Sequence, residues 1–189
     1  MRLFFAIFPP KEIQKAMSDS ASGLRVAGDV RWVRPENIHL TLKFLDEVSD
    51  EKAEKVADFF ANVAERHAPL ALAPSGFGGF PSERKARVIW IGAKGATETL
   101  RALAEDIESE CENLGFERES RPFSPHFTLG RARKRFVEIE VEREAETRGA
   151  EIPAFEAKEI HLVKSETKKE GAIYTPLKTF RLSPRKADG

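Results

Sequence analysis

Two stretches of this chain carry the same short pattern, HLTL at residues 39–42 and HFTL at residues 126–129. In each, a histidine and a threonine stand two positions apart, and apolar residues fill the alternate positions. Side chains at positions i and i+2 of a β-strand point to the same face. We therefore expect His39 and Thr41 to share one face of a strand, and His126 and Thr128 to share one face of another.

The residues around the two patterns match as well. Each pattern follows an Arg-Pro pair, Arg34-Pro35 and Arg121-Pro122, and the two histidines stand 87 positions apart in a chain of 189. This indicates a diverged internal duplication, in which a pseudo-twofold axis would bring two imidazoles and two hydroxyls into one cleft. The buried face of the first strand is expected to carry Leu40, Leu42 and Phe44.

Two histidines and two threonines in one cleft suit phosphoryl transfer. The transition state needs a base on the attacking oxygen, an acid on the leaving oxygen and donors for the remaining oxygens. Histidine, with an ordinary pKa near 6.5, can be acid or base at neutral pH. The pattern therefore predicts chemistry that uses no metal, with threonine hydroxyls on the phosphate oxygens.

The other two histidines lack this context. His67 falls at a helix end, and His161 lies in EIHLVKS, where Val163 occupies the position that the threonine would take. A single histidine is more often an ordinary, partly buried residue than a catalyst, so neither is expected to take part in the chemistry.

Composition limits the other possibilities. The 31 basic and 31 acidic residues cancel, so RNA binding would need a local patch rather than a global cationic field. The single Cys111 excludes an internal disulfide framework and a multi-cysteine zinc site. No metal or other cofactor is expected. The apolar run near the start is too short for a membrane span or a secretory segment, so we expect a cytoplasmic protein without a membrane partner.

Strand-like and helix-like segments alternate, and Gly or Pro turns join several strand pairs, which predicts the α+β class with antiparallel sheets. A helix should follow Pro9-Pro10. Ser49 should cap a helix that runs to about Arg66, and Thr97 one that ends at Gly115. The period of segment 136–148 is compatible with a strand or a helix.

Apolar stripes predict which helix residues face the core. We expect that face to include Val56, Phe59, Phe60, Val63, Leu100, Leu103, Ala104, Ile107, Cys111 and Leu114. Residues 1–182 are expected to form one domain, followed by a frayed tail over 183–189.

With its two His-x-Thr-x motifs, the chain resembles the 2H phosphoesterase superfamily, and within it the RNA 2',3'-cyclic phosphodiesterases, also called 2'-5' RNA ligases. The resemblance extends over nearly the whole chain, through RLFFAIFPP, RWVRPENIHLTLKFL, GFGGFPS with RVIWIG, FSPHFTLGR and the closing KSE and GAIYTPLKTF. It implies two pseudo-symmetric lobes of antiparallel sheet with outer helices around a central cleft.

The resemblance also implies an activity, which is metal-independent hydrolysis of RNA 2',3'-cyclic phosphate ends to 2'-phosphates. Reversible 2'-5' joining of tRNA halves accompanies it in such proteins. Carried onto this chain, His39 would be the general acid on the 3'-oxygen and His126 the general base on water. Thr41 and Thr128 would bind phosphate oxygens.

Arg131 stands at the family's arginine position just after the second motif, and would add a charge-assisted contact to the phosphate. Strict strand alternation points Arg131 away from Thr128, unless Gly130 hosts a β-bulge that turns it back.

The sequence offers several candidates for contacts with RNA beyond the phosphate, without deciding among them. Basic candidates are Arg31, Arg34, Arg118, Arg121, Arg131, Arg133, Lys134 and Arg135. Aromatic candidates for stacking on a terminal base are Trp32, Phe80 and Tyr174. Two other functions remain: a phosphodiesterase for small cyclic nucleotides of the ADP-ribose cyclic phosphate type, and a non-catalytic nucleotide-binding module. A monomer is expected.

Overall fold

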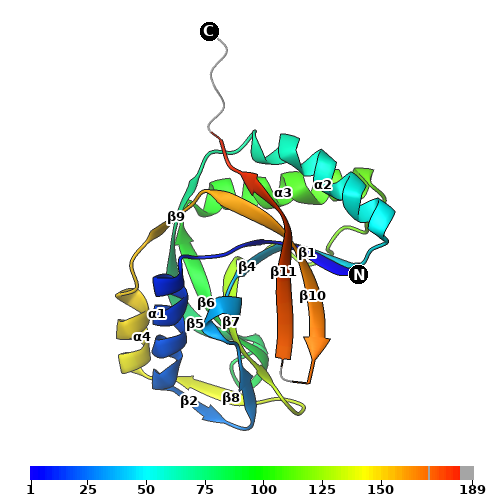
Figure 1. Ribbon diagram of the computed structural model, residues 1–189. Coiled ribbons are helices and arrows are strands. Elements are labelled where there is room, and N and C mark those ends of the chain that lie inside the picture. Colours follow the sequence, from blue (N-terminus) through cyan, green and yellow to red (C-terminus); the bar gives the residue numbers. More distant parts are fainter. Residues whose placement is uncertain (170, 184–189) are drawn as a thin grey trace.

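The computed structural model describes residues 1–169 and 171–183 (Figure 1). In the first half of the chain the elements are β1 (Arg2–Ile7), α1 (Lys11–Ser20), the short 3-10 helix η1 (Ala21–Gly23), β2 (Leu24–Ala27), β3 (Val30–Trp32), the 3-10 helix η2 (Pro35–Asn37), β4 (Leu40–Glu47) and α2 (Asp50–Ala64). The second half holds β5 (Leu70–Ser82), β6 (Lys85–Gly95), α3 (Thr97–Asn113), β7 (His126–Ala132), β8 (Glu138–Val141), α4 (Arg143–Ala150), β9 (Phe155–Ala157), β10 (Glu159–Lys168) and β11 (Gly171–Arg181).

One large antiparallel sheet runs through the molecule in the order β11-β10-β1-β4-β7-β6-β5-β9, and β3 also pairs with β7. A separate two-stranded sheet joins β2 to β8. The junction between β4 and β7 divides this order into two sets of four strands, and β3 is the ninth strand of the sheet, beside β7. This arrangement confirms the predicted α+β class with two pseudo-symmetric lobes.

The helices pack in two pairs. In Figure 1, α2 and α3 lie side by side at the top, and α1 and α4 lie side by side at the left. Their apolar faces meet one face of the sheet in a single cluster that contains Phe5, Leu40, Phe60 and Phe127. The opposite face of the sheet is therefore left to carry the polar residues of the two motifs.

The helix predictions were partly right. The hydroxyl oxygen of Ser49 accepts a hydrogen bond from the backbone N–H of Lys52, at 3.3 Å, so Ser49 caps α2 as expected. Thr97 is the first residue of α3 and not its cap, because the capping position belongs to Ala96. Phe59 was predicted to face the core but is 39% exposed. Cys111 is fully buried in the core as predicted, and its burial raises the pKa of the thiol to about 12.

Two further segments are defined by the structure. Residues 76–86 consist mostly of the arms of the β5–β6 hairpin, which are held together by ladder pairs as far as Ser82 and Lys85. The ambiguous segment 136–148 contains both alternatives, since strand β8 is followed by helix α4. Most of the predicted frayed tail, residues 184–189, lies outside the described residues. Within residues 1–169 and 171–183, the helices are all too short or too polar to span a bilayer.

A bulge in β4 overturns the prediction for Phe44. In the pairing with β1, Ala6 faces Thr41 and Phe5 faces Lys43, so Leu42 is an extra residue and the alternation reverses. Lys43 is consequently buried, and its Nζ donates hydrogen bonds to Glu108, at 2.5 Å, and to the carbonyl oxygen of Glu117, at 2.6 Å. Phe44 lies on the other face and is 55% exposed.

Candidate active site

The junction between the lobes brings the two motifs together. Leu40 pairs with Phe127, and both side chains are fully buried in the core. Counting outward along the antiparallel strands then sets His39 opposite Thr128, and Thr41 opposite His126. In a regular sheet the two histidines are diagonal neighbours, for which the typical separation is about 7–8 Å. The sheet face opposite the core thus gathers all four polar side chains, two from each half of the chain.

Both imidazoles are held in the same tautomer. Nδ1 of His39 lies 2.7 Å from the carbonyl oxygen of Asn37, and Nδ1 of His126 lies 2.6 Å from the carbonyl oxygen of Ser124. A carbonyl oxygen can only accept a hydrogen bond, so Nδ1 must carry the proton in each ring. In each histidine, Nε2 is therefore the nitrogen that is available for proton transfer. The duplication extends to this contact, because each acceptor stands two residues before its histidine.

His39 lies among aromatic rings. The ring centroids of Phe4, Phe8 and Tyr174 are 4.9, 5.3 and 5.1 Å from the imidazole. This burial lowers the pKa of His39 to about 4, against the opposing effect of the bond to Asn37. The hydroxyl of Thr41 donates to Nε2 at 3.1 Å. His39 is therefore neutral at pH 7 while the site holds no phosphate.

His126 lies in a similar corner of the second lobe. Phe80 meets its ring edge-on at 5.0 Å, and Trp90 lies 6.2 Å away. Burial is again the main cause that lowers the pKa of His126, and the positive charge of Arg131 lowers it further. The charge of Arg131 also lowers the pKa of His39. One guanidinium therefore acts electrostatically on both imidazoles.

A bulge in β7 turns Arg131 toward the site. Trp90 faces Thr128 whereas Ile89 faces Gly130, so Leu129 is an extra residue in β7. The bulge places Arg131 on the face that carries Thr128, which resolves the conflict with strict alternation. A side chain on Gly130 would lie 2.7 Å from Cγ1 of Val30. Glycine therefore lets the side chains of Val30 and Trp32 pack closely against β7.

Sequence reasoning missed Phe44 as a residue on the face of the two motifs. After the β4 bulge, its ring lies on the same face as His39, with its centroid 5.9 Å from that of Phe4. Phe44 stands five residues after His39, as Arg131 stands five residues after His126. Aligning the two motifs through the bulge would have found it. The duplicated position holds an aromatic residue in one lobe and a cation in the other.

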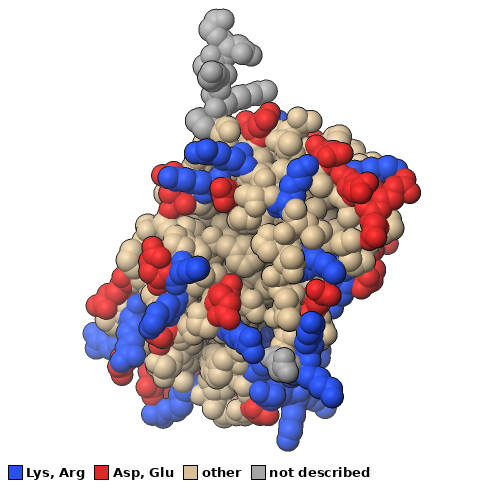
Figure 2. Space-filling model, viewed as in Figure 1, with Lys and Arg blue, Asp and Glu red and all other residues tan. Residues whose placement is uncertain are grey.

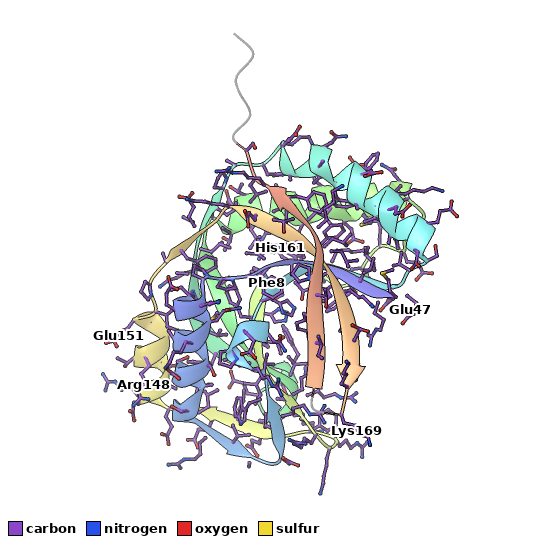
Figure 3. All side chains as sticks on the ribbon, in the orientation of Figure 1. Phe8, Glu47, Arg148, Glu151, His161 and Lys169 are labelled. Atoms are coloured by element: carbon purple, nitrogen blue, oxygen red, sulfur yellow. The ribbon has the colours of Figure 1, made fainter. Side chains whose placement is uncertain are left out.

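The remaining histidines differ in their positions. His161 shares the sheet face of the two motifs, because Ala6 of β1 pairs with His161 on one side and with Thr41 on the other. The ring centroid of Phe8 is 5.3 Å from that of His39 and 5.6 Å from that of His161, and Figure 3 labels Phe8 and His161 close together. Nδ1 of His161 is 3.0 Å from the hydroxyl oxygen of Thr179. His67 lies at the end of α2, with Nε2 2.7 Å from a carboxylate oxygen of Asp106.

The aromatic candidates for base stacking have other contacts. Tyr174 and Phe80 meet the two histidines edge-on, and Trp32, although 44% exposed, packs where a Cβ of Gly130 would lie. Phe44, at 55%, is more exposed than Trp32.

The basic candidates are distributed unevenly. Arg118 is held by Glu105 and Glu112, and Arg133 lies 3.3 Å from Asp29. Figure 2 shows Lys and Arg side chains gathered at the lower right, around the foot of the β10–β11 hairpin, where Figure 3 places Lys169. This face of the molecule therefore has a local concentration of positive charge.

Comparison with known proteins gives a consistent result. The family model described as LigT like Phosphoesterase matches twice, over residues 7–90 and 91–174. An RNA 2',3'-cyclic phosphodiesterase of Methanocaldococcus jannaschii is 33% identical over 95% of this chain and 100% of its own. One from Thermus thermophilus is 33% identical over 96% of this chain and 90% of its own.

Solved structures agree with the fold. The structure of Escherichia coli LigT complexed with 3'-AMP is 30% identical, covers 96% of this chain and 97% of its own, and superposes with a TM-score of 0.76. A structure described as a phosphoesterase is 31% identical, covers 96% of this chain and 98% of its own, and has the same TM-score. With two family matches that together cover most of the sequence, this chain belongs to the LigT-like phosphoesterase family.

Proposed function

We propose that the protein hydrolyses 2',3'-cyclic phosphate ends of RNA to 2'-phosphates. The observation that carries this proposal is the position of His39 and His126 as diagonal neighbours on adjacent strands. In each ring Nδ1 is bound to a carbonyl oxygen, which leaves Nε2 for proton transfer. The curated relatives named above are RNA 2',3'-cyclic phosphodiesterases, which supports the same substrate class. Residues 1–182 act as one catalytic unit, because both lobes supply residues to the site.

Each step of the reaction has a named group. Nε2 of His126 takes a proton from water as the water oxygen attacks phosphorus. The bond between phosphorus and the 3'-oxygen breaks, and the protonated Nε2 of His39 gives its proton to that oxygen. The hydroxyls of Thr41 and Thr128 donate to the other phosphate oxygens, and Arg131 offsets their negative charge.

The lowered pKa of His39 fits this scheme only when the phosphate is bound. A nearby negative charge favours the protonated imidazole, so the incoming phosphate raises the pKa of His39 from its free value of about 4. The phosphate also provides an acceptor for the hydroxyl of Thr41, which otherwise donates to Nε2. Substrate binding thus prepares the acid.

Phe44 serves the terminal base. Its ring is exposed on the catalytic face, beside the aromatic rings that surround His39. Every base has a flat π-face, so stacking on Phe44 would hold the terminal nucleoside with little preference among bases. The terminal base would lie beside the first lobe, which carries Phe44. The phosphate would lie toward Arg131 of the second lobe.

The same groups would join RNA ends if a 5'-hydroxyl replaced water. His126 would take the proton of that hydroxyl, the 3'-oxygen would leave as before, and the product would carry a 2'-5' linkage. We extend the proposal to tRNA halves as such a pair of ends. Both histidines come from one chain, so a monomer is sufficient, and a cytoplasmic location fits these substrates.

The test is product analysis in the presence of EDTA. RNA that ends in a 2',3'-cyclic phosphate should be hydrolysed, and comparison with synthetic standards should show only the 2'-phosphate. A strict requirement for added Mg²⁺ or Zn²⁺ would contradict the acid–base mechanism. A 3'-phosphate product would reverse the assignment of the leaving oxygen. A second RNA with a 5'-hydroxyl, added to the same reaction, tests for the joined product.

A substrate with a good leaving group distinguishes the acid role of His39 from the base role of His126. A nucleoside 2'-phosphodiester of p-nitrophenol has a leaving group that needs no proton. His39→Ala should therefore lose little activity on it, while His126→Ala should still lose about 10²–10⁴ in rate. The opposite result would exchange the acid and the base.

A further inference from the structure

A second arginine lies beside Arg131 on the catalytic face. In the pairing of β3 with β7, Arg31 stands directly opposite Arg131. Directly opposite residues of an antiparallel pair point to the same face of the sheet. On its other side, Arg131 pairs with Val88 of β6, while Thr128 pairs with Trp90. Val88 and Trp90 stand two positions apart on β6, so Arg131 and Thr128 share one face of the sheet. Arg31 is thus on the face that carries both catalytic histidines.

The two arginines have no acidic partner in the part of the chain that the structure describes. Opposite side chains in an antiparallel pair have Cβ atoms about 4.5–5.5 Å apart, and like charges at this distance destabilise the sheet. Within residues 1–169 and 171–183, neither guanidinium forms an ion pair. By contrast, Arg133, which directly follows β7, forms an ion pair with Asp29. Arg25 on β2 forms an ion pair with Glu142. An uncompensated pair of cations at a catalytic face indicates that anions bind there.

The backbone holds Arg31 firmly in this place. Val30 and Trp32, its neighbours on β3, pack against the space where Gly130 has no side chain. The backbone N–H of Val33 donates to the carbonyl oxygen of Leu129, at 2.8 Å, and extends the attachment of β3 to β7. The sheet therefore holds the backbone of Arg31, so only its side chain has to become ordered when an anion binds.

The two cations lie on neighbouring strands, β3 and β7. Arg131 belongs to the reacting phosphate, since its charge acts on both histidines. Arg31 lies one strand further out, about 4.8 Å away in a regular sheet. A nucleic-acid strand carries a phosphate at every nucleotide, so the next anion along the substrate lies beyond the terminal ribose. A cyclic mononucleotide without a 5'-phosphate has no such group.

We infer that Arg31 binds the phosphodiester that joins the terminal nucleotide to its 5' neighbour, so the site prefers an RNA end to a cyclic mononucleotide. This inference rests on the proposed function. It makes Arg31 a specificity residue, because it contacts the part of the substrate that does not react. It also separates RNA from small cyclic nucleotides, which the two His-x-Thr motifs by themselves do not.

The experiment compares Arg31→Gln with the wild-type protein on three substrates. They are a dinucleotide with a 2',3'-cyclic phosphate end, the cyclic mononucleotide, and the same dinucleotide with a neutral methylphosphonate at its internal linkage. Arg31→Gln should raise KM about 10-fold on the first substrate, as expected for one lost charge-assisted contact, and leave the second unchanged. On the methylphosphonate substrate, the wild-type protein and the variant should be equal.

Salt dependence gives a second measurement. Each phosphate contact with a single strand contributes about 0.7 to the slope of log affinity against log salt concentration. Arg31→Gln should reduce the slope for the dinucleotide by about that amount. The matched control is Arg25→Gln. It removes the same charge from an arginine on β2 of the small sheet, which forms an ion pair with Glu142.

Three results would overturn the inference. An equal loss on all three substrates would place Arg31 at the reacting phosphate. A loss on none would leave it without a role in binding, and an equal loss in Arg25→Gln would reflect only the overall charge. Failure of the wild-type protein to hydrolyse any cyclic substrate would instead count against the proposed function, so the two failures are distinguishable.

Discussion

Leu40 of β4 pairs with Phe127 of β7 at the junction of the two lobes, and both side chains point into the core. Their neighbours on both sides necessarily point to the opposite face. A single buried contact thus fixes the relative position of His39, Thr41, His126 and Thr128. The pseudo-twofold axis of the molecule passes through this contact, so each histidine faces the threonine of the other motif.

The histidine pair should behave as one unit. His39→Ala and His126→Ala should each raise the activation free energy by about 3–5 kcal/mol, because each removes one proton-transfer group. The double variant should be little worse than the worse single variant. Single-turnover rates on a cyclic-phosphate RNA would measure this. His161→Ala and His67→Ala are the controls, and a loss in His161→Ala as large as in His126→Ala would show that the wrong pair has been assigned.

The pH dependence of activity follows from the same pair. His39 must be protonated to act as an acid, and burial lowers its pKa to about 4 in the free protein. The value of kcat/KM should therefore fall about tenfold per pH unit above pH 6.5. The profile of kcat should fall at a higher pH, because bound phosphate raises the pKa of His39. A kcat/KM that stays constant from pH 6.5 to 9 would contradict the acid role.

Stability should depend on pH through His39. Its pKa is about 4 when folded and about 6.5 when unfolded, so the unfolded chain binds the proton more readily. The stabilisation is complete above pH 6.5 and is lost as pH falls toward 4. Between pH 7 and pH 5, the wild-type protein should lose about 2 kcal/mol more than His39→Gln. Urea unfolding at the two pH values measures the difference, and parallel losses would disprove the burial effect.

Phe44→Ala should weaken substrate binding. Loss of a stacked base costs about 1–3 kcal/mol, which would appear mainly in KM. Phe44→Trp should retain binding, because it keeps an aromatic face. Steady-state kinetics on a cyclic mononucleotide isolates the effect from contacts with the rest of an RNA. Phe59→Ala, another exposed phenylalanine but on α2, is the control. Equal kinetics for Phe44→Ala and Phe59→Ala would exclude the stacking role.

Gly130→Ala should damage both stability and activity. The new Cβ would lie 2.7 Å from Val30 and 3.0 Å from Trp32, so β3 would have to move away from β7. Overpacking of this kind costs about 1–3 kcal/mol. The shift would also misplace Arg131, whose orientation depends on the adjacent bulge. Val30→Ala in the same chain should restore part of the stability by making room. A Gly130→Ala protein with unchanged midpoint and rate would refute the packing argument.

Local pattern in the sequence determined the strand faces of the two His-x-Thr motifs, the α+β class, the cap at Ser49 and the buried face that holds Cys111. These follow from side-chain periodicity within a few residues, which a linear sequence displays directly. The matching Arg-Pro leaders and the half-chain spacing also revealed the two-lobed arrangement.

Only the tertiary structure decided which residues join the candidate site. Phe44 and Arg131 lie on the face of the two His-x-Thr motifs because bulges at Leu42 and Leu129 reverse the alternation, and a bulge is defined by pairing with a neighbouring strand. Arg31 joins them because β3 pairs with β7, about 100 residues away in sequence. The tautomers of the two histidines likewise depend on where the carbonyl groups of Asn37 and Ser124 lie in space. Periodicity states which side chains share a face of one strand, but the register between strands determines which faces meet.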